Sequence, residues 1–198
     1  MNFIELLEHS KVDKSIIDDF GQWLFHIKDI KGYSINTYRS YCYDVCDFFI
    51  FYQYYHQVSL SQSNLKSLDL QTFRAWVADI GTNRNYTNVY KRPLSARSRR
   101  RAISSLKNYL KFSSIKNPNY KSSFTEIQLL KNPKIPKTLP KPISEEQIDQ
   151  LIDQLTKVSK KKWIQKRNLA LLYLLYGCGL RINEALSITK NHLADKQS

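Results

Sequence analysis

The chain has 198 residues, of which 42% are hydrophobic and 24% charged, and it contains only 5 glycines and 6 prolines. This composition is that of a globular protein large enough to bury a core, and it excludes collagen-like repeats and a largely disordered chain. No apolar run is long enough to span a membrane. The N-terminal residues include acids and lack the hydrophobic core of a secretory signal peptide. We therefore expect a cytoplasmic protein without a membrane partner.

The positive charge is concentrated in one part of the chain. Lys and Arg number 31 against 17 Asp and Glu, which gives a net charge of +14. Residues 80–140 contain 14 of these basic residues and one acid, Glu126, so this third carries +13 and the rest of the chain +1. Such a cluster predicts a surface for a polyanion, above all nucleic acid. The alternative is a basic face that serves only solubility.

The three cysteines predict reduced thiols rather than disulfides or a metal site. Cys42 and Cys46 lie one helical turn apart and Cys178 stands alone, so no CxxC pair is present. Zinc-type sites need ligands paired at short spacings. We therefore expect no metal and no cofactor.

Apolar residues at steps of three and four predict a helix over about the first 30 residues. The stretch KGYSINTY at 31–38 breaks this pattern, and its Ser34 is a candidate N-cap for the next helix. That helix carries one stripe of apolar and aromatic side chains, which we interpret as core and not as a cofactor site. Arg39, Tyr43, Asp44 and Asp47 fall elsewhere on the helix. The stripe consists of Tyr38, Tyr41, Cys42, Val45, Phe48, Phe49, Tyr52 and Tyr55.

A polar loop is expected at 59–67, then a short helix over 70–80 and a basic connector. Ser95 is the candidate N-cap of the following helix, which we place at about 95–112. At about 100° per residue, this helix divides into an apolar and a polar face, with Arg99 on the apolar one. The polar face holds Arg97, Arg100, Arg101, Ser104, Lys107, Asn108 and Lys111.

The five cations of this polar face would repel one another unless an anion lay nearby. No glutamate alternates with them, although solvated faces usually mix the two signs. Lys and Arg bind DNA phosphates, and Arg can also read guanine edges in a major groove. The polar face therefore predicts a DNA contact, with a solvated helix face as the alternative.

Proline and lysine dominate the segment KNPKIPKTLPKPI at 131–143, which predicts an extended tether. The following Ser144-Glu145-Glu146-Gln147 is a capping-box pattern that opens another helix. Further helical segments follow at 163–176 and in LRINEALSI, and no segment alternates as a strand does. We predict an all-α protein with a first domain over 1–130, a linker over 131–142 and a second domain over 143–198.

Four segments resemble, in the right order, those of the tyrosine recombinases, the phage-integrase family. They cover most of residues 31–190 and read YSINTYRSYCYDVCDFFIF, LSARSRRRAISSLKNYLKF, LPKPISEEQIDQLI and LLYLLYGCGLRINEALSI. Within the family they are most similar to the Xer recombinases of bacteria. The resemblance implies a SAM-like, core-binding helical domain over 1–130, followed by the first helices of a catalytic domain.

The family's activity is site-specific DNA recombination, in the Xer case of the chromosome-dimer resolution type. A tyrosine attacks a phosphodiester and forms a 3′-phosphotyrosine without metal or ATP, while two arginines and a lysine stabilise the transition state. Arg181 matches the first of these arginines, and Glu184 matches a position that supports it. A guanidinium suits this role because its planar donors can hold two phosphate oxygens. A purely structural Arg181 is the alternative.

The resemblance also implies double-stranded DNA, as a recombination half-site, for the partner. A second recombinase subunit is a further candidate partner, and no small-molecule substrate is expected. The residues we expect to contact DNA are Thr37, Arg39, Arg97, Arg100, Arg101, Ser104, Lys107 and Lys111.

The sequence also departs from the family's pattern. The catalytic lysine, the His-x-x-Arg box and the nucleophilic tyrosine have no match before Ser198, and His192 lacks the arginine of that box. Asn168 and Cys178 replace residues that are usual in the family. We therefore expect an N-terminal fragment that binds DNA but does not cleave it. Two alternatives stay open: a non-catalytic DNA-binding module, such as a decayed recombinase, and a helical protein-interaction or RNA-binding domain.

Overall fold

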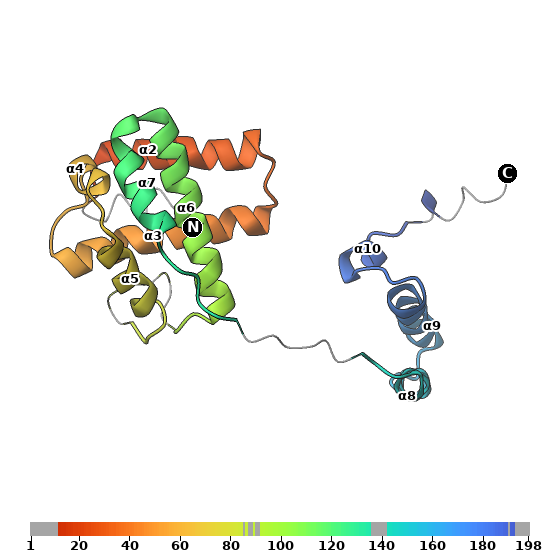
Figure 1. Cartoon of the computed structure of the whole chain (residues 1–198). Coiled ribbons are helices and arrows are strands. Elements are labelled where there is room, and N and C mark those ends of the chain that lie inside the picture. Colours follow the sequence, from red (N-terminus) through yellow and green to blue (C-terminus); the bar gives the residue numbers. More distant parts are fainter. Residues whose placement is uncertain are drawn as a thin grey trace. The chain divides into compact units, whose positions relative to one another are not determined.

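The computed structural model describes residues 12–84, 86, 89, 92–135, 142–189 and 191–192. These residues are helical and contain no strand, which confirms the predicted all-α class. The chain divides into two compact units, Met1–Pro136 and Lys137–Ser198 (Figure 1). The start of the predicted N-terminal helix, at 1–11, and residues 136–141 of the predicted linker lie outside the described residues.

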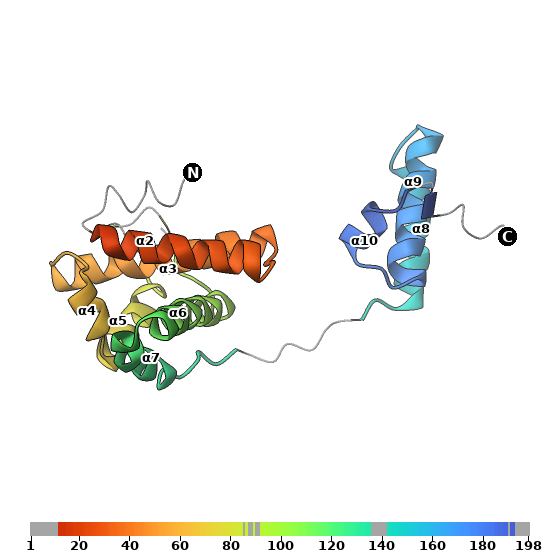
Figure 2. The same ribbon diagram turned by 90° about the horizontal axis from the view of Figure 1, so that it is seen from above.

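The first unit begins with an antiparallel helix pair (Figures 1 and 2). Helix α2 spans Lys14–Phe25 and continues into a π-helical turn, η1, at His26–Ile30, and α3 spans Ile35–His56. Gly32 lies between the two helices at φ 63°, a backbone conformation that side chains with a Cβ rarely adopt. Ser34 caps α3 as predicted, because its hydroxyl accepts a hydrogen bond of 3.3 Å from the third residue of the helix.

Two short helices follow α3. Helix α4 spans Gln62–Lys66, where the sequence predicted a polar loop. Ser61 and Asn64 form a reciprocal capping box around this turn, and Leu65 anchors it in the core. A capped single turn needs no long apolar pattern, which is why periodicity missed it. Helix α5 spans Leu70–Asp79.

The basic helix predicted from the sequence is α6, which spans Ala96–Lys116. It crosses the antiparallel pair of α2 and α3 (Figures 1 and 2). A 3-10 turn, η2, at Pro118–Tyr120 then leads into α7 at Lys121–Gln128. The crossing brings the apolar side of α6 against both helices of the pair.

Aromatic side chains fill the space where these three helices meet. Tyr109 of α6 packs edge-on against Phe20, Trp23 and Phe49, with ring centroids 5.5 to 6.2 Å apart. Such edge-to-face contacts stabilise a core beyond the area they bury. The predicted stripe of α3 lies in this core, with Tyr55 exposed, Tyr38 and Tyr41 partly buried, and Cys42, Val45, Phe48, Phe49 and Tyr52 buried.

Helix α3 is buried on more of its surface than its apolar stripe predicts. Residues 44–49 are all buried, and six successive residues pass completely around a helix. Asp44 and Asp47, which lie off the stripe, both have a relative exposure of 0%. A buried carboxylate is costly unless it is paired, so each of these acids requires a cationic partner.

The second unit is built of short helices with little buried surface. Its elements are α8 (Glu145–Lys157), α9 (Lys162–Leu172), a π-helical turn η3 (Tyr173–Gly177) and α10 (Ile182–Leu186). The predicted capping box at the start of α8 is present, with Ser144 and Gln147 bonded to each other's amides at 3.3 and 3.0 Å. Ile148 and Ala185 are the only buried residues among those described in this unit. No described helix is both long and apolar enough to cross a membrane.

Candidate nucleic-acid interface

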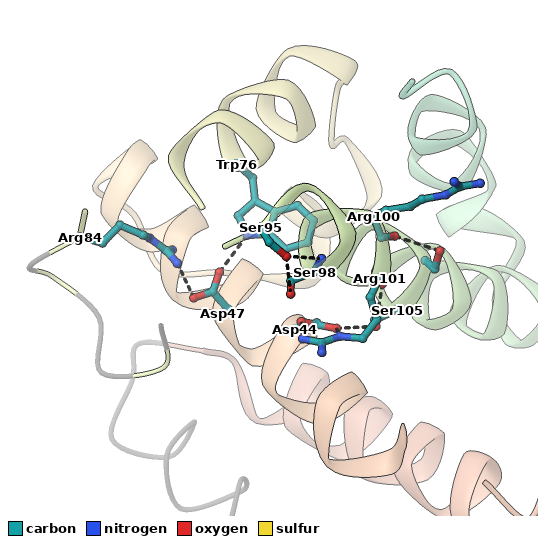
Figure 3. A network of polar contacts seen from close by, with 10 residues as sticks. Asp44, Asp47, Trp76, Arg84, Ser95, Ser98, Arg100, Arg101 and Ser105 are labelled. Atoms are coloured by element: carbon teal, nitrogen blue, oxygen red, sulfur yellow. Dashed lines mark hydrogen bonds and ion pairs between the residues drawn. The ribbon is translucent and has the colours of Figure 1, made fainter. Parts of the chain in front are cut away.

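Helix α6 presents most of its predicted basic face to solvent. Its N-cap is Ser95, as predicted, whose hydroxyl accepts a hydrogen bond of 3.2 Å from the Ser98 amide. Lys107 is half-buried, and this burial lowers the pKa of its ammonium group from the usual value. Arg100 points away from the carboxylates of α3 (Figure 3). The exposed members of the predicted set on this helix are Arg97, Arg100, Ser104 and Lys111.

The start of α3 holds the other two predicted contact residues. The Thr37 hydroxyl lies 2.9 Å from that of Ser34, and the Arg39 side chain is exposed. Amides in the first turn of a helix carry a partial positive charge that favours phosphate. The electrostatic potential at the first turn of α3 is therefore positive, like that around the cations of α6.

Arg101 joins α6 to α3 through an internal ion pair. Its Nε and Nη2 each donate to Asp44, at 3.1 Å, and Ser105 donates to the same carboxylate at 2.7 Å (Figure 3). The Arg101 side chain keeps a relative exposure of 38%. Arg101 thus has a structural contact that the sequence did not predict, and its contact with DNA stays a prediction.

Arg84 belongs to the basic third of the chain but was not singled out by the sequence, and it is the most deeply buried cation described. Its relative exposure is 3%, and its Nη1 donates to Asp47 at 2.7 Å. The Trp76 indole donates to the other oxygen of Asp47 at 3.0 Å (Figure 3). Burial raises the pKa of Asp47, while the hydrogen bond and charge of Arg84 oppose this rise. Burial alone would lower the pKa of Arg84, but the contacts with Asp47 raise it.

A third buried acid holds the far end of α6. Asp19 of α2 accepts a hydrogen bond of 2.6 Å from Ser113 and an ion pair of 3.1 Å from Lys116. Arg84, Arg101 and Lys116 thus each pair with an acid of α2 or α3. Acids within the largely apolar helices α2 and α3 were the sequence signal that could have predicted these ion pairs.

In the second unit, Arg181 and Glu184 form an exposed pair at the start of α10. The guanidinium donates to Glu184 at 2.9 Å, and the Arg181 amide donates to its other oxygen at 2.8 Å. These bonds lower the pKa of Glu184, the backbone contact more than the side-chain contact. The Arg181 side chain has a relative exposure of 87%. Gly179, at φ 65°, makes the turn into this helix.

The predicted site residues therefore fall into two groups. Those of α3 and α6 lie in the first unit, where the Arg101–Asp44 pair joins the two helices. Arg181 and Glu184 lie together in the second unit. Among the described residues, no group of three His, Cys, Asp or Glu side chains could hold a metal ion.

Comparison with known proteins gives matches over both units. Residues 20–114 match the phage integrase N-terminal SAM-like domain. The chain is 35% identical over 182 residues to the tyrosine recombinase XerC of Rickettsia canadensis, and 34% identical to the XerC proteins of Rickettsia felis and Rickettsia bellii. Each alignment covers 92% of this chain and 56% of the relative, so the chain spans little more than half the length of these relatives. No solved structure matches the chain significantly.

Proposed function

Since this chain belongs to the Xer-type tyrosine recombinases, we propose that its first unit binds duplex DNA through α6 and the start of α3. The contact residues in this proposal are Thr37, Arg39, Arg97, Arg100, Arg101, Ser104, Lys107 and Lys111. The proposed role of the whole protein is site-specific recombination through a phosphotyrosine, which the chain serves as a DNA-binding part.

One observation carries the proposal: some cations of α6 pair with buried acids, and the others face solvent. Arg101 and Lys116 pair with buried acids of α2 and α3, whereas Arg97, Arg100 and Lys111 point to solvent on a helix that contains no Asp or Glu. Internal pairing accounts for the first group, whereas the second group forms no ion pair with the residues that the structure describes. Exposed cations on one helix face are the means by which proteins bind DNA phosphates.

For Arg181 we propose contact with the phosphate at which the strand is cut. Its guanidinium is exposed and permanently charged, and one hydrogen bond to Glu184 orients it, while the other oxygen of Glu184 accepts from the Arg181 amide. A phosphate can displace solvent from the remaining donors while Glu184 keeps the side chain in place. Arg181 would act by stabilising charge on the non-bridging oxygens, which supports catalysis without supplying a nucleophile.

Salt titration tests the proposed DNA contact. If about six phosphates are contacted, the logarithm of the binding constant should fall against the logarithm of the salt concentration with a slope of about −5. The variant R97Q/R100Q should reduce the slope by about 2, because each lost contact removes about 0.9. The matched control K14Q/K121Q removes two exposed cations from α2 and α7 and should leave the slope unchanged. A wild-type slope near zero would refute DNA binding.

The variant R100E/R101E is a poorer test. Glutamate at 101 would face the buried carboxylate of Asp44, so the variant would lose stability whether or not it lost a DNA contact. Arg97 and Arg100 are exposed on the solvent side of α6, so replacing them separates the two effects. Circular dichroism of each variant verifies that the helices persist.

Strand cleavage is tested with a nicked suicide duplex and denaturing gels. We expect no covalent protein–DNA adduct from the chain alone, while binding persists. An adduct would show that the chain carries a working nucleophile. Competition with a folded RNA hairpin completes the test, because preference for RNA over duplex DNA would favour an RNA-binding domain instead.

A further inference from the structure

The connector between α5 and α6 is fastened to the fold at both of its ends. At its end, the Leu94 amide donates to the Ile80 carbonyl at 2.8 Å, next to the N-cap of α6. At its start, Gly81 lies against Arg99 from the first turn of α6, so that a Cβ on Gly81 would be only 2.9 Å from Nη1 of Arg99. Arg99, which lies on the apolar side of α6, thus packs against the start of the connector.

Arg84 anchors the connector between these ends. Its Nη1 donates to Asp47 of α3 at 2.7 Å, and its Nε lies 2.6 Å from Asp79 at the end of α5. Its Nη2 donates to the Tyr86 hydroxyl at 2.8 Å, and that hydroxyl also bonds to Asp79. All three guanidinium nitrogens therefore have partners, and the residue joins α3, α5 and the connector at one buried point.

Tyr86 continues this anchor to the end of α3. Its ring stacks on that of Tyr54 with centroids 3.8 Å apart and an angle of 2° between the planes. The guanidinium carbon of Arg84 lies 5.0 Å from the centre of the Tyr86 ring. The side chains at 84 and 86 thus hold the connector against α3 and α5.

We infer that Arg84 is a positioning residue for DNA binding, which sets the first turn of α6 so that Arg97 and Arg100 reach the phosphates. This inference rests on the proposed function. Arg84 is too deeply buried to contact DNA itself. Its contribution passes through Asp79 to the end of α5, where Ile80 and Gly81 contact Leu94 and Arg99. These contacts position the first two turns of α6, which carry Arg97 and Arg100.

Removing the guanidinium would release the connector without touching the DNA-facing side chains. In R84M, Asp47 keeps the Trp76 donor and Asp79 keeps the Tyr86 donor, but the link between the two carboxylates is lost. The buried carboxylate of Asp47 and the partly exposed one of Asp79 then repel each other and draw in water. The first turn of α6 would lose its fixed position, while the middle of the helix stays held by the Asp44–Arg101 pair.

The experiment compares R84M with K116M in the full chain. Each variant removes one cation. R84M breaks the ion pairs with Asp47 and Asp79, and K116M breaks the pair with Asp19 at the C-terminal end of α6. The readouts are the denaturation midpoint and the salt dependence of binding to a fluorescent DNA duplex. A merely structural residue changes the midpoint only, because the salt slope counts phosphate contacts and not stability.

We expect the slope to change from about −5 in the wild type to about −3 in R84M, and to stay at its wild-type value in K116M. If R84M does not fold, R84K should show the same change in part, since a single ammonium cannot reach both acids. An unchanged slope in the folded variant would overturn the inference, and so would failure of both variants to fold, because Arg84 would then be a folding determinant. A wild-type slope near zero would instead refute the proposed function.

Discussion

In the first unit, α3 is enclosed on every side at its middle, whereas in the second unit no residue of α9 is buried. Both helices belong to strongly apolar stretches of sequence, so composition does not account for the difference. Helices α2, α5 and α6 pack around α3 and contribute its aromatic partners, while Arg101 of α6 and Arg84 of the connector pair with its acids. In the described second unit, α8 and α10 leave much of α9 open to solvent.

The comparison shows that an apolar helix acquires a core only from its neighbours. A large side chain that becomes fully buried contributes about 1.5 to 3 kcal/mol, but a half-exposed one contributes much less. The large exposed side chains of the second unit are Ile143, Val158, Trp163, Tyr173, Tyr176, Ile182 and Leu186. We therefore expect most of the stability of the chain to reside in its first unit.

The largest expected effect comes from truncating an aromatic residue in each unit. Phe48→Ala should destabilise the first unit by about 3–5 kcal/mol, because it leaves a cavity between Phe73 and Trp76. Tyr173→Ala, at a residue with 58% relative exposure, should cost less than about 0.5 kcal/mol. Chemical denaturation followed by circular dichroism measures both. Equal losses in the two units would contradict the comparison.

Ion pairs should differ between the units in the same way. Asp47→Ala should cost about 3–5 kcal/mol, because it leaves the buried Arg84 with a reduced set of acceptors. Asp153→Ala, which breaks the exposed pair with Lys157, should leave the denaturation midpoint unchanged. The same denaturation experiment tests this prediction. It would fail if the surface variant lost as much stability as the buried one.

Alkaline pH should destabilise the first unit. Burial, the largest cause, raises the pKa of Tyr38 to about 12, and burial also raises the pKa of Tyr109 well above its usual value. Above pH 10 the unfolded chain loses these phenol protons while the folded chain retains them. Stability is thus fully present below about pH 10 and declines as the pH rises towards 12. Denaturation midpoints across this range test the prediction, and Tyr38→Phe should reduce the decline.

The smallest effect is expected at the exposed pair of the second unit. Glu184→Ala should not measurably change the denaturation midpoint, because both Glu184 and Arg181 stay in contact with water. The variant should nevertheless weaken any effect of Arg181 on bound DNA, since the guanidinium loses the hydrogen bond that orients it. Comparing DNA affinity and midpoint in the same variant separates the two. A large loss of stability would show that α10 depends on this pair.

Short-range sequence patterns predict much of the fold. Ser34, Ser95 and Ser144 each cap the helix that the sequence placed after them, since a cap depends on residues only three positions apart. The aromatic stripe of α3 and the cation-rich face of α6 were visible for the same reason. The helical turn of α4 was missed because its cap acts without an apolar repeat.

The sequence by itself established an all-helical chain, its charged third and the residues proposed to contact DNA. Only the tertiary structure decided which cations face inward. Arg84, Arg101 and Lys116 pair with acids 37, 57 and 97 positions away, and no local pattern carries information over such separations. Burial makes these pairs necessary, because a carboxylate enclosed by helices must find its cation wherever the fold brings one.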